Sequence, residues 1–247
     1  MEPEPARRIA WIDCAAGAAG DMLLAALVDA GAGLDVVAEH VARLGVEPIT
    51  LRRTEVERHG IGAVKVDVDT APDPEHRTWK AVRLVLDAAG LPEPVATLAH
   101  DAFARLAEAE ARVHRTTPDD VHFHEVGALD AIADVVGVAT ALHLLGVDAV
   151  HASPVALGSG TSRGSHGLVP IPAPATLEVL RAAGAPCFAG PSPREMCTPT
   201  GAALLAAAVT SWGPMPRMVP QAIGVGAGTR DLAEVANVVR VVVGDAV

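Results

Sequence analysis

The chain has 247 residues, of which 50% are hydrophobic and 20% are charged, so we expect a globular protein rather than a disordered chain or a coiled coil. Its formal net charge is −11, and it contains no run of Lys or Arg that could neutralise the phosphates of nucleic acid or an anionic membrane surface. Aromatic residues make up only 2%, which disfavours a platform for stacked bases. We therefore expect neither nucleic acid nor a membrane as a partner.

The N-terminal residues and the cysteines both favour the cytoplasm. Prolines and acidic residues occupy positions 2–5, where a signal peptide needs basic charge followed by an apolar stretch. Cys14, Cys187 and Cys197 are widely spaced and form no CxxC motif, which is typical of a reducing compartment. Cys14 precedes a predicted helix N-terminus, a position that lowers thiol pKa values, but we favour a buried structural thiol.

The predicted elements alternate between strands and helices. In chain order, the hydrophobic patterns predict a strand at 9–13, helices at 21–30 (capped by Asp21) and 35–44, strands at 49–56 and 63–68, helices at 79–89 and 94–114, a strand at 121–125, a helix at 128–145, a strand at 150–155, a long functional loop at 158–174, helices at 175–183 and 200–212, a proline-dense linker at 214–220 and a strand at 235–243. This order predicts an α/β fold, a mixed sheet flanked by helices, with a helical segment near residues 75–115.

The strongest local motif is His122-Phe-His124-Glu125. Residues two apart in a strand lie on the same face, so both imidazoles can point toward one ion, and imidazole with carboxylate suits nickel, zinc, copper or iron. Polar strand faces also produce such pairs without any ligand. His166 lies in a flexible segment with little packing reason for a histidine, and it is a further candidate ligand.

Two pairs on helices flank this motif. Glu110 and His114 are four residues apart, and an exposed ion pair is the simpler explanation for them. Asp130 and Asp134 share one face of the next predicted helix, where like charges repel unless a cation lies nearby. Asp130 has an alternative role at the helix N-terminus, which favours anions, whereas Asp134 lies deeper in the helix.

Three turns rich in Gly, Ser or Thr stand beside helix starts or strands and are candidate phosphate cradles. None of them matches a specific nucleotide-binding motif, and a plain turn is an alternative for each. The candidate cofactor-binding residues in these turns are Gly17, Gly20, Asp21, Gly158, Gly160, Thr161, Thr198 and Thr200.

Several blocks together resemble the LarC family of nickel-insertion proteins, and the resemblance covers residues 9–244, an N-terminal nickel-insertion domain with a possible helical subdomain at 75–117. The blocks occur in one order and are far more specific together than singly. They are Asp13-Cys14 to Leu24, Val121 to Gly127, Ser153 to Gly160, His166-Gly to Pro174, Thr198 to Leu205 and Gly224 to Asp231.

The resemblance implies a CTP-dependent nickel insertase of the lyase class. Its reaction places nickel in pyridinium-3,5-bisthiocarboxylic acid mononucleotide through two Ni–S bonds and one Ni–C bond, with CTP and Mg or Mn, to make the cofactor of lactate racemase-type enzymes. Family members continue into a C-terminal domain to which CTP binding is attributed, and this chain ends without it. We expect that domain and a racemase apoenzyme as partners, and a homo-oligomer.

Within that function we assign the metal to His122, His124, Glu125 and His166. We assign the role of proton acceptor, or of support for a ligating histidine, to Asp134 or Asp130.

Two other functions stay open. The first is a non-catalytic subunit that binds nickel and delivers it to a separate CTP-binding domain. The second is a phosphate-ester enzyme that uses Asp13 and Asp21 with magnesium, which leaves the histidines without a role.

Overall fold

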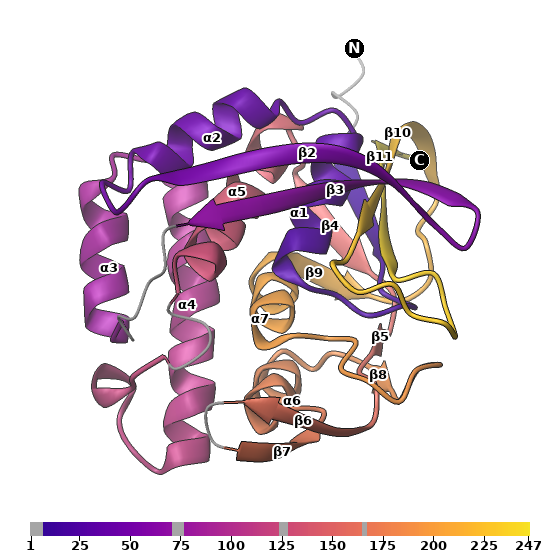
Figure 1. Cartoon of the computed structure of the whole chain (residues 1–247). Coiled ribbons are helices and arrows are strands. Elements are labelled where there is room, and N and C mark those ends of the chain that lie inside the picture. The colour runs from indigo at the N-terminus through magenta and orange to yellow at the C-terminus, as the bar shows by residue number, and fades with distance from the viewer. Residues whose placement is uncertain (1–6, 71–76, 124–127, 165–166) are drawn as a thin grey trace.

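A computed structural model describes residues 7–70, 77–123, 128–164 and 167–247, and it confirms the α/β class. A mixed seven-stranded sheet with the order β2-β3-β10-β11-β1-β4-β9 forms the centre of the fold (Figure 1). Its strands are β1 (Arg8–Asp13), β2 (Ile49–Arg58), β3 (Ile61–Thr70), β4 (Ala149–Ala152), β9 (Val209–Trp212), β10 (Met218–Ala227) and β11 (Val238–Ala246).

The first strand lies inside the sheet rather than at its edge. β1 pairs antiparallel with β11 and parallel with β4. Its side chains alternate: Ala10 and Ile12 are buried in the core, while Trp11 and Asp13 point to the other face. On that face Asp13 forms an ion pair with Arg240 of β11. The helices therefore cover one face of the sheet (Figure 1).

Seven α-helices are described, and most of them share one hydrophobic core with the sheet. α1 packs along β3, β10 and β11, and α5 packs behind α1, α2 and α4. The predicted helical segment is formed by α3 and α4, and their side chains Trp79, Phe103 and Leu106 belong to that same core. The helices are α1 (Gly20–Asp29), α2 (Leu34–Ala42), α3 (Trp79–Ala88), α4 (Glu93–His114), α5 (Leu129–Leu144), α6 (Pro174–Ala182) and α7 (Pro199–Ala208).

Four local predictions need correction. The predicted loop at 158–174 contains the hairpin of β6 (Gly160–Gly164) and β7 (Gly167–Ile171). The predicted helix at 200–212 ends at Ala208, because the chain continues into β9, which pairs with β4. The predicted linker at 214–220 runs into β10, a strand that the sequence did not predict. Asp21 lies in the first turn of α1, whose N-cap is Ala19.

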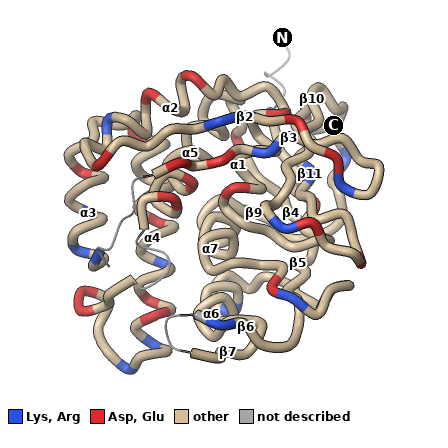
Figure 2. Tube along the Cα trace, viewed as in Figure 1, with Lys and Arg blue, Asp and Glu red and all other residues tan. Residues whose placement is uncertain are grey.

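Other segments agree with expectation or are shorter. The predicted strand at 150–155 is divided into β4 and β5 (Val155–Ala156), and β5 pairs with β8 (Cys187–Phe188). Of the predicted strand at 121–125, the described part forms one bridge, between His122 and Thr78. Among the helices in the described ranges, none has the length and apolar character needed to cross a membrane. Lys and Arg are scattered over the chain rather than gathered in a stripe (Figure 2).

Candidate functional site

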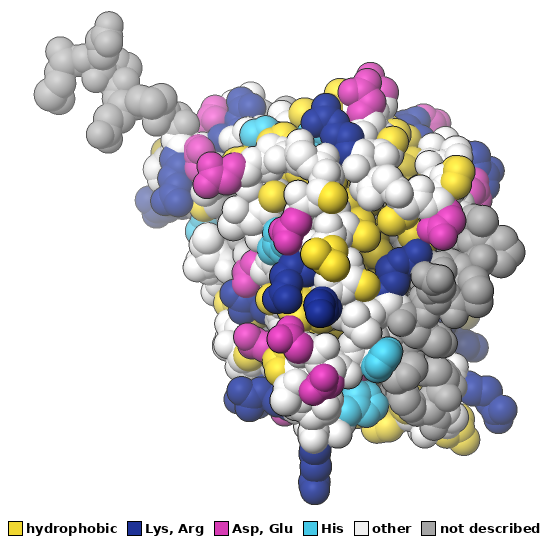
Figure 3. Space-filling model, turned by 90° about the vertical axis from the view of Figure 1, so that its left-hand side faces the viewer, with side chains coloured by type: hydrophobic (Ala, Val, Ile, Leu, Met, Phe, Trp, Pro, Cys, Tyr) yellow, Lys and Arg dark blue, Asp and Glu magenta, His cyan; other side chains and the backbone are white. Residues whose placement is uncertain are grey.

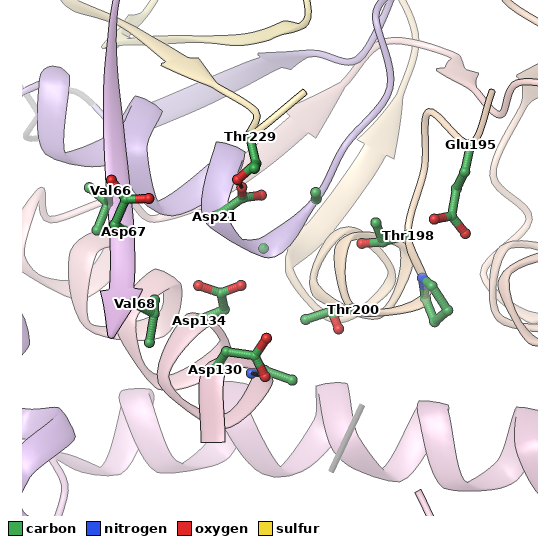
Figure 4. A pocket seen from close by; sticks show the side chains of 14 residues that line it. Asp21, Val66, Asp67, Val68, Asp130, Asp134, Glu195, Thr198, Thr200 and Thr229 are labelled. Carbon is green, nitrogen blue, oxygen red and sulfur yellow. Dashed lines mark hydrogen bonds between the residues drawn. The ribbon is translucent and has the colours of Figure 1, made fainter. Parts of the chain in front are cut away.

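A pocket of about 370 Å³ lies where the N-terminal ends of α1, α5 and α7 converge beside β3 (Figure 4). Because helix N-termini present unpaired N–H groups and a positive dipole end, they favour anionic groups at this place. The polar residues that line it, which we call the carboxylate pocket, are Asp21, Asp67, Asp130, Asp134, Glu195, Thr198, Thr200 and Thr229.

Asp134 of α5 is half-buried, and its carboxyl group lines this pocket. Figure 4 shows it between Asp21 and Asp130. Its Oδ1 atom has no solvent exposure and no hydrogen-bond partner within the described residues. Burial raises the pKa of Asp134 well above its usual value, and the charges of Asp21 and Asp130 raise it further. A carboxyl group with a raised pKa can exchange a proton closer to neutral pH than an ordinary aspartate.

The first residue of α1 must be small for Asp134 to occupy this position. A Cβ atom on Gly20 would lie 2.4 Å from Oδ2 of Asp134 and 2.8 Å from its Cγ. The backbone of α1 therefore packs directly on the carboxyl group of α5. Gly20 was predicted as a phosphate-cradle residue, and the structure places it in the pocket as a direct neighbour of Asp134.

The two neighbouring carboxylates differ from Asp134 in their surroundings. The pKa of Asp21 is raised by burial, and this is opposed by hydrogen bonds from the Met22 backbone N–H at 2.8 Å and the Thr229 hydroxyl at 3.4 Å. Asp130 is exposed at the start of α5, where it accepts a hydrogen bond from the Ala131 N–H at 2.8 Å. The pocket thus offers two half-buried carboxyl groups, those of Asp134 and Asp21, beside the exposed carboxyl group of Asp130.

The start of α7 forms the opposite wall. Thr198 is the N-cap of α7, and its hydroxyl accepts a hydrogen bond from the Gly201 N–H at 3.1 Å. Thr200 is buried in the first turn and also lines the pocket. Of the residues predicted to bind a cofactor, Gly20, Asp21, Thr198 and Thr200 are therefore brought together with the two aspartates of α5.

The glycines at 17 and 158 pack against the chain segment before α7. Gly17 has φ +94°, and a Cβ on it would lie 1.9 Å from the Met196 carbonyl oxygen. Gly158 has φ +85°, and its Cβ would lie 1.7 Å from the Arg194 carbonyl oxygen. Both residues permit a close approach of two backbones, and neither lines the carboxylate pocket.

A second pocket of about 490 Å³ adjoins the hairpin β6–β7, of which Gly160 is the first residue. Thr161, another predicted cofactor-binding residue, lines this pocket rather than the carboxylate pocket. Glu195 lines both. We call this second site the arginine pocket, after three of its lining residues, Arg163, Arg194 and Arg230.

The predicted metal ligands are described only in part. His122 is exposed, bridges Thr78 through its backbone and does not line the carboxylate pocket. His124, Glu125 and His166 lie outside the described residues. Histidine side chains are visible on the face shown in Figure 3. Within the described ranges, no three His, Cys, Asp or Glu side chains are arranged to hold a metal ion.

The remaining candidate pairs have structural roles. His114 Nε2 and Glu110 Oε2 are 3.4 Å apart, which fits the ion pair favoured by their spacing. Asp13 is paired with Arg240 and is absent from the residues lining the carboxylate pocket, so the geometry does not support a magnesium site made of Asp13 and Asp21. Cys14 is buried, and burial raises the pKa of its thiol. This agrees with the predicted structural thiol rather than with an activated one.

Sequence reasoning missed several residues that line the pockets. Asp67 reads as the outward face of an alternating strand, and only the position of β3 beside α1 brings it to the carboxylate pocket. Arg194 and Glu195 stand in a segment without any motif. Thr229 and Arg230 belong to the block 224–231 that contributes to the family resemblance, which was the one available signal for them.

Comparison with known proteins gives a consistent result. A family model described as "Nickel insertion protein" matches residues 10–247. A relative from Nocardioides, named "Pyridinium-3,5-bisthiocarboxylic acid mononucleotide nickel insertion protein", is 53% identical over 95% of this chain and 59% of its own length. A relative from Roseiflexus castenholzii, named "Putative nickel insertion protein", is 46% identical over 96% of this chain and 60% of its own.

The chain therefore spans about three fifths of the length of these relatives. No solved structure matches it.

Proposed function

The chain belongs to the nickel insertion protein family, and on that premise we propose that it inserts nickel into pyridinium-3,5-bisthiocarboxylic acid mononucleotide. We place the reaction at the carboxylate pocket. The observation that carries this placement is the Oδ1 atom of Asp134, a residue that lines the pocket: this atom is enclosed and has no hydrogen-bond partner in the described part of the chain. A carboxylate oxygen that is enclosed without a hydrogen bond is costly to the fold, so the retention of Asp134 favours a chemical role.

The chemistry requires a base. Nickel is a substrate here, and it replaces a hydrogen on a carbon of the pyridinium ring while the two thiocarboxylates supply their sulfur atoms. The ring C–H bond breaks, its electron pair goes to the new Ni–C bond, and a proton must be accepted. Asp134 in its ionised form takes that proton, and its raised pKa makes it a stronger base than an ordinary aspartate.

The remaining residues of the proposed site bind one of the two substrates, either nickel or the mononucleotide. We propose His122, His124, Glu125 and His166 as the residues that carry nickel to the pocket, because imidazole with carboxylate suits this cation. The converging N-termini of α1 and α7 favour the anionic thiocarboxylates. We further propose that CTP, with Mg or Mn, acts through the C-terminal part found in the longer relatives, and that a racemase-type apoenzyme receives the product.

A metallation assay tests the proposal. The chain is incubated with the mononucleotide and Ni²⁺, with and without CTP, Mg²⁺ and the C-terminal part of a relative, and the product is measured by mass spectrometry. We expect metallation that depends on this chain and that is lost in Asp134→Asn. Nickel binding without metallation under every condition would instead identify a subunit that only delivers nickel.

A further inference from the structure

Three arginine side chains gather at one pocket. Arg163, Arg194 and Arg230 are exposed and line the arginine pocket. Within the described ranges, no hydrogen bond or ion pair engages their guanidinium groups, although the chain has an excess of acidic residues. Elsewhere Arg52, Arg181 and Arg240 each pair with a carboxylate.

The two pockets share one wall, and two short segments build it. In the segment of Arg194 and Glu195, the arginine lines the arginine pocket and the glutamate lines both pockets. In the other segment, Thr229 lines the carboxylate pocket and Arg230 lines the arginine pocket. A hydrogen bond of 2.9 Å from the Asn237 side chain to the Arg230 carbonyl oxygen holds the second segment. One ligand can therefore contact both pockets across this wall.

We propose that the arginine pocket binds the phosphate group of the mononucleotide whose ring is metallated in the carboxylate pocket. This inference rests on the proposed function and adds the orientation of the substrate to it. A guanidinium group can donate two parallel hydrogen bonds to two oxygens of one phosphate. Thr161 and Ser162 line the same pocket, and their hydroxyl groups are further donors. Each cavity has the size of a small-molecule site, and the three arginines of the arginine pocket outnumber its two glutamates, Glu195 and Glu234.

The test compares the mononucleotide with its nucleoside, prepared by phosphatase treatment, in calorimetric titrations of the chain. We expect the mononucleotide to bind at least about tenfold more tightly than the nucleoside. Arg194→Ala and Arg230→Ala are each expected to weaken mononucleotide binding by roughly tenfold and to leave nucleoside binding unchanged. Unfolding curves confirm that these exposed substitutions leave the fold intact.

Arg217→Ala provides the matched control. Arg217 is exposed, lines neither pocket and precedes β10, whereas Arg230 follows the other end of that strand, roughly 30 Å away at about 3.3 Å per residue. We expect its mononucleotide affinity to equal that of the unmodified chain.

The possible outcomes separate the two proposals. Unchanged mononucleotide binding in both Arg194→Ala and Arg230→Ala would overturn the phosphate site and leave the proposed function standing. A loss confined to binding of CTP, titrated alone, would assign the arginines to the other phosphate source and would also overturn the inference. Failure of the unmodified chain to bind either form of the precursor would overturn the proposed function, and the phosphate site with it.

Discussion

The carboxylate pocket and the arginine pocket share Glu195 but are built from different parts of the fold. The first is formed by the starts of three helices packed on the sheet, and its key group, Asp134, is held against the backbone at Gly20. The second is formed by a hairpin and by segments outside the helices, and its arginines are exposed. Burial shifts a pKa, whereas exposure leaves charges free to meet a diffusing ligand. The comparison therefore assigns proton chemistry to the first pocket and anion capture to the second.

The largest effect is expected from Asp134→Asn, which keeps the shape and removes the base. Product formation should fall by roughly 10²- to 10⁴-fold, because proton transfer is lost, while mononucleotide binding at the arginine pocket survives. Single-turnover metallation and calorimetry measure the two quantities on the same protein. Equal losses in both would end the separation of roles between the pockets.

Gly20→Ala tests the position of Asp134 rather than its charge. Its Cβ would lie 2.4 Å from Oδ2 of Asp134, so the carboxyl group must move. We expect metallation to fall by roughly 10- to 100-fold, as for the loss of other groups that orient a reacting residue. Gly62→Ala in β3 is the control, because nothing lies within 4 Å of its added Cβ. The same loss in both variants would contradict the explanation.

The next prediction concerns the predicted nickel ligands, whose replacement should change nickel binding and leave the binding of the mononucleotide unchanged. His122→Ala combined with His124→Ala should weaken nickel binding by at least about tenfold without changing mononucleotide affinity, because imidazole ligates the metal and not the phosphate. Nickel binding should also weaken below about pH 6, since a ligating imidazole must be neutral. Unchanged nickel affinity in a titration of the double variant would remove these residues from the metal site.

The smallest effect concerns stability. The pKa of Asp134 is raised in the folded protein, so above the unfolded pKa of about 3.9 the folded state binds more protons than the unfolded state. Stability is therefore lost as pH rises from about 4 through the raised pKa. Asp134→Asn removes this loss and should unfold at a higher temperature at pH 7, with a gain of about 1.4 kcal/mol for each pKa unit.

At about pH 4 the gain should largely vanish, because the carboxyl group is then protonated in the folded chain and increasingly so in the unfolded chain. Asp231→Asn serves as the control, since Asp231 is exposed and does not line the carboxylate pocket. If Asp134→Asn stabilises the folded chain as much at pH 4 as at pH 7, the ionisation of Asp134 is not the cause of the gain in stability.

Hydrophobic periodicity predicted most helices and the central strands, because amphipathic patterns follow from one-sided burial. It failed for β10, where Gly224 and Gly226 resemble a loop. A Cβ on Gly226 would lie 2.0 Å from the Met22 carbonyl oxygen, so glycine is required there by the approach of α1. It failed for β9, which continues from α7 without a break in the sequence pattern.

The site was predictable only where its residues are close in the sequence. The spacing of Asp130 and Asp134 indicated a shared helix face, and both line the carboxylate pocket. Asp67 and Arg194 reach their pockets through packing between distant segments, which no local pattern encodes. Gly17 was predicted as a ligand contact, and the structure shows that it permits close backbone packing, because a turn that permits such packing and a turn that binds phosphate need the same residue.

The pairing of β1 with β11 has a consequence for how the molecule is made. Arg8 lies opposite Asp245, so this pairing joins two strands that are far apart in the sequence. Closing so long a loop is entropically costly, and folds dominated by such distant contacts form slowly. The turn that leads from β1 into α1 carries Gly20 and Asp21, and it is anchored only when this strand is in place. The carboxylate pocket therefore depends on a contact between two strands that lie far apart in the sequence.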